Sequence, residues 1–199
     1  MGAGFWIMSR AITAPTRGIP SGGTPGPPFR KSEPNRTHKL MYDSTLLMLL
    51  DDVRGKTLNE LQGLDESQAR WAPPGLQNSC LWHAGHAYVV TEFLTMKALD
   101  RDPQMPEGWL KMFSWESNPA HTSPASWPSL ATVASALKTQ HERLRGIIEA
   151  LTPDQLEAPE PLNPARPVRY AILHGLHDEA RHSGEISLLR KLMTRTFLE

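Results

Sequence analysis

The chain has 199 residues, which suits a single domain, and its 21 basic and 21 acidic side chains give a formal net charge of zero. Six of the basic residues but only one acidic residue fall within positions 1–39, so the remainder is mildly acidic, which argues against a nucleic-acid-binding surface. Cys80 is the sole cysteine, which excludes an internal disulfide, and no apolar run approaches the about 20 residues of a membrane-spanning helix, so we expect a soluble, cytoplasmic protein.

Residues 1–37 are rich in proline and glycine. Such a segment cannot bury enough apolar surface to offset the entropy cost of ordering it. Proline and glycine also break the amphipathic helix that a targeting peptide uses. We therefore predict a disordered basic tail over residues 1–37 and a folded domain over residues 38–199.

From residue 40 onward, apolar residues recur at helical spacing. We predict four long helices: about residues 40–63, from Asn78 or Ser79 to about Leu99, from Ser126 or Ser129 to Leu151, and about residues 168–195. Helices of similar length bury their apolar stripes most readily against one another. The predicted fold is therefore all-α, an antiparallel four-helix bundle.

The connections between these helices differ in length. Residues 100–128 hold five prolines and three tryptophans, which predicts a long crossover between helices two and three, with a short helix near residues 107–113. Short turns are predicted at about residues 65–71 and 153–157. The prolines of residues 159–167 predict an extended linker, and the chain shows no convincing strand pattern.

The fourth helix carries a row of polar side chains on one face. His174, Asp178 and His182 are spaced at i, i+4 and i+8, so they lie within about 80° of one another. Leu189 continues this face, which therefore points inward. His177 is displaced from it and cannot easily share a ligand with His182.

Two other predicted helices place histidines among apolar residues. In the second helix, His86 belongs to the stripe Trp82, His86, Val89 and Phe93, while His83 lies on a neighbouring apolar stripe. In the third helix, His141 belongs to a predicted seam of Leu130, Ala134, Leu137, His141, Leu144, Ile148 and Leu151. A buried imidazole needs a partner, because leaving it unsatisfied costs free energy.

A hydrogen-bonded core residue is the simpler explanation of any single inward histidine. A carboxylate beside two histidines is different, because a buried carboxylate is costly without a cation. We therefore predict that His86, Asp178 and His182 bind one divalent metal ion, zinc in preference to nickel or iron. Two alternatives stay open: His83 replaces His86, or His174 or His177 joins the site.

The segment that holds this histidine resembles the second helix of DinB-like proteins. In that family a Ser or Thr caps the helix and a metal-binding histidine follows seven residues later, and Ser79, Trp82 and His86 fall on this pattern. The run from His182 to Glu185 resembles the end of the family's last helix. The carboxylate at Asp178 resembles the ligand of members similar to mycothiol-dependent maleylpyruvate isomerase.

The resemblance covers about residues 40–195 and implies a DinB-like four-helix bundle with one metal ion. It implies thiol-dependent transferase or isomerase chemistry on a small-molecule substrate, with a low-molecular-weight thiol as cosubstrate. A metal-dependent hydrolase is the first alternative, and a non-catalytic metal-binding or structural bundle is the second.

Several further residues are candidates for a role in such a protein. Glu185 and His174 are the predicted catalytic residues, and His141 is a further candidate for moving protons. Cys80 lies at the start of the second helix, where the helix dipole would lower its pKa, although we interpret it as a packing residue. The apolar run at residues 46–50 suggests that the first helix also contacts a second copy in a homodimer.

Overall fold

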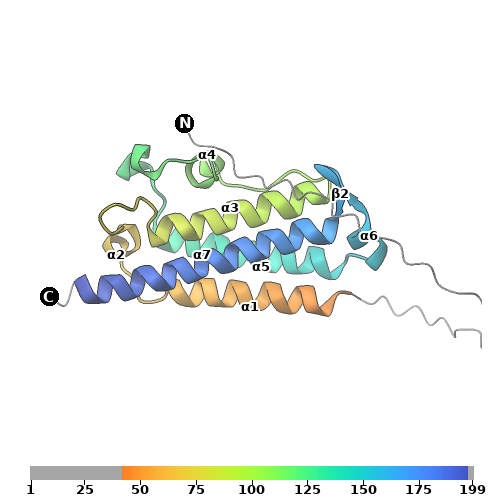
Figure 1. Ribbon diagram of the computed structural model, residues 1–199, viewed down its shortest axis with the longest axis horizontal. Coiled ribbons are helices and arrows are strands. Elements are labelled where there is room, and N and C mark those ends of the chain that lie inside the picture. The colour runs from red at the N-terminus through yellow and green to blue at the C-terminus, as the bar shows by residue number, and fades with distance from the viewer. Residues whose placement is uncertain (1–41, 197–199) are drawn as a thin grey trace, which may run out of the picture. The chain divides into compact units, whose positions relative to one another are not determined.

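The computed structural model describes residues 42–196, so the tail predicted over residues 1–37 lies outside the described part of the chain. Within residues 42–196, four long helices form a bundle, which confirms the predicted fold class (Figure 1). These helices are α1 (Ser44–Leu61), α3 (Cys80–Ala98), α5 (Leu130–Glu149) and α7 (Val168–Thr196).

Shorter elements connect the long helices. They are α2 (Glu66–Arg70), α4 (Trp109–Phe113), η1 (Pro119–His121), η2 (Pro124–Ser126), α6 (Pro153–Glu157), β1 (Pro159–Glu160) and β2 (Asn163–Pro167). The strands pair as an antiparallel hairpin, which corrects the prediction of a linker without strands. The hairpin buries neither face fully, so its sequence lacks the alternation of apolar residues by which a strand is predicted.

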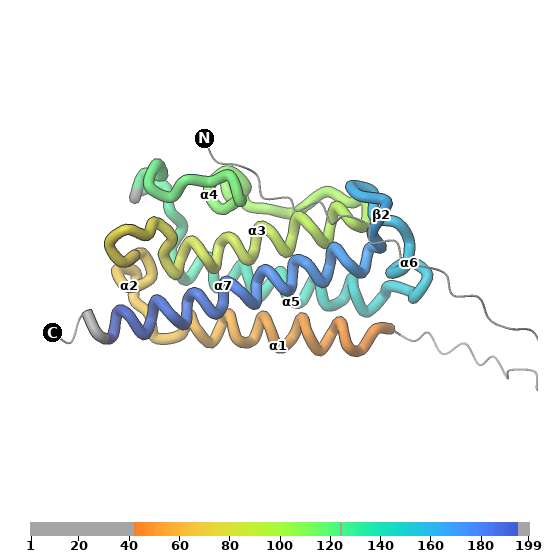
Figure 2. Tube along the Cα trace, in the orientation of Figure 1, coloured from red at the N-terminus to blue at the C-terminus, as the bar shows by residue number. Residues whose placement is uncertain are grey.

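Each long helix packs against two others. α7 contacts α1 and α3, and α5 closes the ring by contacting the same two helices. Figure 2 shows that α1 and α7 run in one direction and that α3 and α5 run in the other. The neighbours α3 and α5 are therefore parallel, and the long crossover between them has to return along the bundle.

Side-chain caps decide where three of the long helices begin. Asp43, Ser79 and Ser129 each accept a hydrogen bond from the backbone N–H three residues later. The second predicted helix is thus capped by Ser79 and not by Asn78. The third is capped by Ser129 and not by Ser126. Within the described residues α1 begins at Ser44, because Asp43 has an extended backbone and its side chain caps the helix.

The N-terminal half of α3 is buried around its whole circumference. Every residue from Cys80 to Glu92 is buried. The sequence of α3 therefore shows several apolar stripes and no polar face. For that reason the spacing of its residues could not decide whether His83 or His86 faces the last helix.

The buried seam of α5 differs from the predicted one at two positions. Val133 and Gln140 are buried in it, where the prediction placed Ala134 and His141. His141 lies instead at the edge of the seam, with its Nε2 2.7 Å from Asp51 Oδ1 on α1. A buried glutamine is stable only when its amide is hydrogen-bonded, and its partners come from distant parts of the chain.

Those partners form a polar network through the bundle that the sequence analysis missed. Arg54 on α1 donates to both carboxylate oxygens of Glu179 on α7, at 2.7 and 2.9 Å, and both side chains are fully buried. Arg54 also donates to Gln140 Oε1, and Gln140 donates to Glu92 on α3. Glu92 in turn pairs with Arg143 on α5. Two arginines and two glutamates thus neutralise each other, as buried charges require.

The surface of α1 keeps one large apolar side chain. Met48 is 69% exposed, whereas the neighbouring Leu46, Leu47 and Leu50 are buried in the core. The homodimer stays a prediction. Among the helices within residues 42–196, none has the length and apolar character needed to cross a membrane.

The pKa of the Cys80 thiol is raised, whereas its place at the start of the helix predicted a lowered pKa. Burial raises the pKa of its thiol to about 11, and this outweighs the lowering effect of Arg190. We expect the native protein to resist a thiol-specific reagent such as DTNB at pH 8, because a thiol with that pKa is almost fully protonated there. One reactive thiol per chain should appear in urea, and rapid labelling of native protein would contradict this.

The same shift makes stability depend on pH. The unfolded thiol loses its proton near the ordinary pKa of 9.0, and the folded thiol loses it only near 11. The free energy of unfolding should therefore fall as pH rises through this window, and it should fall less in a Cys80→Ala variant.

Candidate metal centre

The structure brings together the three residues predicted to bind a metal. His86 lies on α3, and Asp178 and His182 lie one turn apart on α7. Asp178 Oδ2 is 3.4 Å from His86 Nε2 and 3.5 Å from His182 Nε2. The three donor atoms all lie within 4.8 Å of one another, so one ion could contact all of them.

The ring of His86 is oriented by two groups. Its Nδ1–H donates to the carbonyl oxygen of Phe113 at 2.6 Å, and Trp82 stacks on the ring with centroids 4.6 Å apart. A carbonyl can only accept, so the proton of the neutral ring is on Nδ1 and Nε2 keeps its lone pair. The nitrogen near Asp178 is therefore free to bind a cation.

Asp178 provides the clearest sign of a missing positive charge. Its Oδ2 is buried and has no hydrogen-bond partner among the described residues. Burial acts to raise the pKa of this carboxyl; His86 and His182 lower that pKa only when they are protonated, so with neutral imidazoles Arg181 is the remaining lowering charge. A buried, ionised oxygen without a partner is costly, and a bound cation is the group that would satisfy it.

The spacing of these atoms agrees with metal ligation. Ligands that bind one zinc ion at 2.0–2.1 Å in a tetrahedron lie about 3.3 Å from each other. The distances from Asp178 Oδ2 to the two Nε2 atoms, 3.4 and 3.5 Å, are close to that separation. They are too long for good hydrogen bonds.

A second group of donor atoms adjoins the first. His83 Nδ1 and His182 Nδ1 share a hydrogen bond of 2.8 Å, and Glu185 Oε2 lies 2.9 Å from both nitrogens. These are hydrogen-bond lengths and are shorter than the separation of zinc ligands. This group is therefore better suited to orient the His182 ring through its Nδ1 than to bind a metal ion. The Nε2 atom of His182 then faces Asp178.

Two of the imidazoles have pKa values that keep them neutral. Burial lowers the pKa of His83 to about 3, helped by the charges of His182 and His86. Burial also lowers the pKa of His182, as does His86, although Asp178 and Glu185 offset part of this. Neutral imidazole is the form that binds metal, so protons compete weakly for these ligands at neutral pH.

The other candidates from the sequence have different surroundings. His83 and His86 both lie at the centre, His83 in the group with Glu185 and His86 in the group with Asp178, so the choice of His86 as the ligand stays a prediction. His174 and His177 belong to neither donor group among the described residues, so proton transfer by His174 stays a prediction. His141 pairs with Asp51 on α1 and belongs to neither donor group, so its role in moving protons stays a prediction.

The short helix α4 supports His86 in a way that the sequence-based predictions did not include. Phe113, whose carbonyl holds the His86 ring, packs directly on Gly85. A Cβ atom at Gly85 would lie 2.4 Å from the Phe113 ring, which is far inside contact distance. The available signal was a glycine next to a core histidine, in the middle of a helix where glycine is otherwise unfavourable.

We expect Gly85→Ala to destabilise the protein by about 1–3 kcal/mol, as for other overpacked cores, and also to weaken metal binding. Urea unfolding and a zinc titration measure the two effects. Gly146→Ala is the matched control, because its added Cβ has no atom within 4 Å and alanine favours the helix. Equal effects of the two substitutions would contradict the role given to Phe113.

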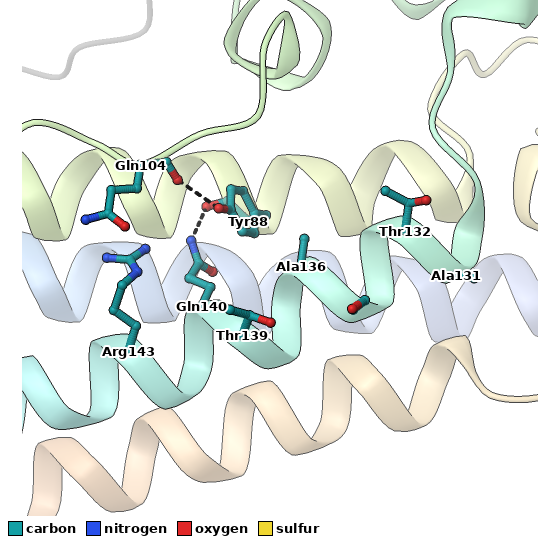
Figure 3. A pocket seen from close by; sticks show the side chains of 9 residues that line it. Tyr88, Gln104, Ala131, Thr132, Ala136, Thr139, Gln140 and Arg143 are labelled. Atoms are coloured by element: carbon teal, nitrogen blue, oxygen red, sulfur yellow. Dashed lines mark hydrogen bonds between the residues drawn. The ribbon is translucent and has the colours of Figure 1, made fainter.

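A separate hollow of about 700 Å³ lies beside α3 and α5 (Figure 3). Its lining includes Tyr88, Gln104, Gln140 and Arg143, and the Tyr88 hydroxyl donates to the Gln104 carbonyl at 2.8 Å. None of the metal-donor residues lines it. The hollow thus adjoins the buried polar network and is distinct from the metal centre.

Comparisons with known proteins agree with this architecture. Residues 49–186 match the sequence model of a family described as the DinB superfamily. The crystal structure of a conserved protein from Enterococcus faecalis has the same fold, with a TM-score of 0.61 and 15% sequence identity over 74% of this chain and 94% of that chain. No curated protein matches the sequence.

Proposed function

The chain belongs to the DinB superfamily, and from that premise we propose that it is a metal-dependent enzyme whose ion is held by His86, Asp178 and His182. The observation that carries this proposal is the buried Asp178 Oδ2, which lacks a partner and lies between two imidazole Nε2 atoms. Two nitrogens and one carboxylate oxygen suit zinc, with nickel or iron as alternatives.

We propose thiol-dependent transferase or isomerase chemistry, with a low-molecular-weight thiol as cosubstrate. Support comes from the carboxylate at Asp178, which resembles the ligand of the thiol-dependent isomerase type. When bound, a divalent ion with open positions supplies a Lewis acid that lowers the pKa of a thiol or water. A hydrolase that uses water in place of the thiol is the alternative.

The residues around the ion would orient it and hold protons. Phe113 keeps the proton of His86 on Nδ1. Glu185 Oε2, 2.9 Å from His182 Nδ1, can accept a hydrogen bond from the Nδ1–H of that ring, which would keep the proton on Nδ1 and leave Nε2 free. The Glu185 side chain is 43% exposed, so it also links the centre to solvent and is the proposed proton carrier for a small-molecule substrate.

The test starts with the metal content of the purified full-length chain, measured by elemental mass spectrometry before and after reconstitution with zinc. About one ion per chain supports the proposal. No ion after reconstitution contradicts it and leaves a helical bundle with structural histidines.

Cobalt-substituted protein then separates the two chemistries. A thiolate-to-cobalt charge-transfer band after addition of mycothiol or glutathione supports thiol chemistry. An unchanged spectrum, together with turnover of simple esters or amides, favours the hydrolase. A loaded protein that shows neither is a metal-binding protein without catalysis.

A further inference from the structure

We propose that Arg54 is a positioning residue for the metal centre and that it acts through Glu179. The inference rests on the proposed function, because it concerns the ion that Asp178 would bind. Arg54 touches none of the metal donors. Its effect would be to hold α7 at the one rotation about its axis that turns Asp178 toward the imidazoles.

The argument begins with the two adjacent residues of α7. Consecutive residues of a helix point about 100° apart. Glu179 is fully buried and pairs with Arg54 of α1, and Thr91 of α3 lies 3.4 Å from its Oε2. Asp178 points toward His86 of α3, whose Nε2 is 3.4 Å from Asp178 Oδ2. A rotation of α7 about its own axis would have two effects at once. It would break the bonds of Glu179, and it would move Asp178 away from His86.

The bonds from Arg54 restrain rotation more strictly than a single contact would. Nε donates to Glu179 Oε1 at 2.7 Å and Nη2 donates to Oε2 at 2.9 Å, so both carboxylate oxygens are held by one planar group. Arg54 also donates to the Leu137 carbonyl and to Gln140 Oε1, which ties the guanidinium to α5. The restraint on α7 is thus anchored in two other helices.

A different contact sets the distance between α3 and α7. A Cβ at Gly175 would lie 3.2 Å from Thr91 Cα, and Thr91 Oγ1 donates to the Gly175 carbonyl. This contact holds α7 at Gly175, one turn before Glu179. The Arg54 pair adds a second restraint on rotation of α7, at Glu179, the residue next to Asp178.

Stability alone does not explain such a pair. Replacing a buried ion pair by apolar side chains of similar volume is often neutral or stabilising, because both charges no longer have to be desolvated. A pair kept only for stability would therefore be easy to replace. The proposal predicts that the same replacement leaves the bundle folded and impairs the metal centre.

The experiment compares wild type with the double variant Arg54→Met, Glu179→Leu. Zinc affinity is measured by chelator competition, and the unfolding temperature is measured without metal. We expect a folded variant with an unfolding temperature close to that of wild type, because the relief of two buried charges is offset by the lost bonds from Arg54 to Gln140 and Leu137. Zinc affinity should be lower by about 10- to 100-fold, as for other residues that orient ligands. The d–d spectrum of bound Co(II) should also change, which a purely structural role would not require.

Two further variants make the result decisive. Glu60→Gln removes another ion pair between α1 and α7, with Arg190, and should leave zinc affinity unchanged. Arg54→Lys keeps the charge beside Glu179 but loses the planar double contact, so it should fold and bind zinc more weakly. Arg54→Lys therefore tests the positioning role of Arg54 even if the double variant does not fold.

The outcomes distinguish the inference from its premise. Wild type that binds no zinc contradicts the proposed function and this inference with it. Wild type that binds zinc, with folded Arg54 variants that bind it equally well, contradicts the positioning role alone. Weaker binding by the Arg54 variants but not by Glu60→Gln supports it.

Discussion

His182→Ala is expected to leave the purified chain without its metal ion. In the proposed site His182 would provide Nε2 to the ion, and its Nδ1 shares a hydrogen bond with His83, so its loss would remove one ligand and disturb the group that orients it. Zinc affinity should fall by more than the about 100-fold that loss of an outer partner causes. The stabilisation of about 2.7 kcal/mol that zinc gives at 100 times its Kd should disappear with it.

Metal content by elemental mass spectrometry and thermal unfolding with and without zinc measure this effect. His141→Ala is the matched control. It also removes a helix histidine that contacts a carboxylate, at 2.7 Å from Asp51, yet it lies outside both donor groups. If His182→Ala keeps a full complement of zinc, the assigned ligands are wrong.

Asp178→Asn should have opposite effects on the metal-free and the metal-bound protein. Without metal, the buried Oδ2 of Asp178 has no hydrogen-bond partner, whereas an asparagine amide could donate to His86 Nε2. We therefore expect the metal-free variant to be as stable as wild type or more stable by about 1 kcal/mol at pH 8. With zinc, the variant should lose most of the stabilisation that wild type gains, because a neutral amide is a poor ligand.

Urea unfolding with and without zinc at pH 8 gives both numbers. Asp51→Asn is a suitable control, because Asp51 also contacts a histidine but is 42% exposed on the surface. A metal-free Asp178→Asn protein that is much less stable than wild type would show that the carboxylate has a structural role and no unmet need for a cation.

Helical periodicity explains why much of this centre could be predicted. Asp178 and His182 are four residues apart, so any helix places them on one face. His86 was found because it stands among large apolar residues. The contribution of His83 was left open, since α3 is buried on all sides and spacing gives no single inward direction there.

Other features depend on contacts that spacing does not encode. Arg54 and Glu179 are residue types normally found on the surface, and they lie 125 positions apart, so nothing local marks them as a buried pair. The carbonyl of Phe113 that orients His86 belongs to the backbone, which every residue has. The predicted seam holds His141 in place of Gln140 because spacing does not show which of two adjacent residues finds buried partners on other helices.

The order in which the helices are made also limits when an ion can be bound. His83 and His182 are 99 positions apart, and α7 is the last helix in the described part of the chain. A growing chain would expose α1, α3 and α5 before it contained Asp178 or His182, and domains assemble as their segments leave the ribosome. The nascent protein would therefore have one face of α3 uncovered and an incomplete set of ligands. Loading of the proposed ion would therefore have to follow synthesis of α7, and a chain cut short before that helix would have no centre to load.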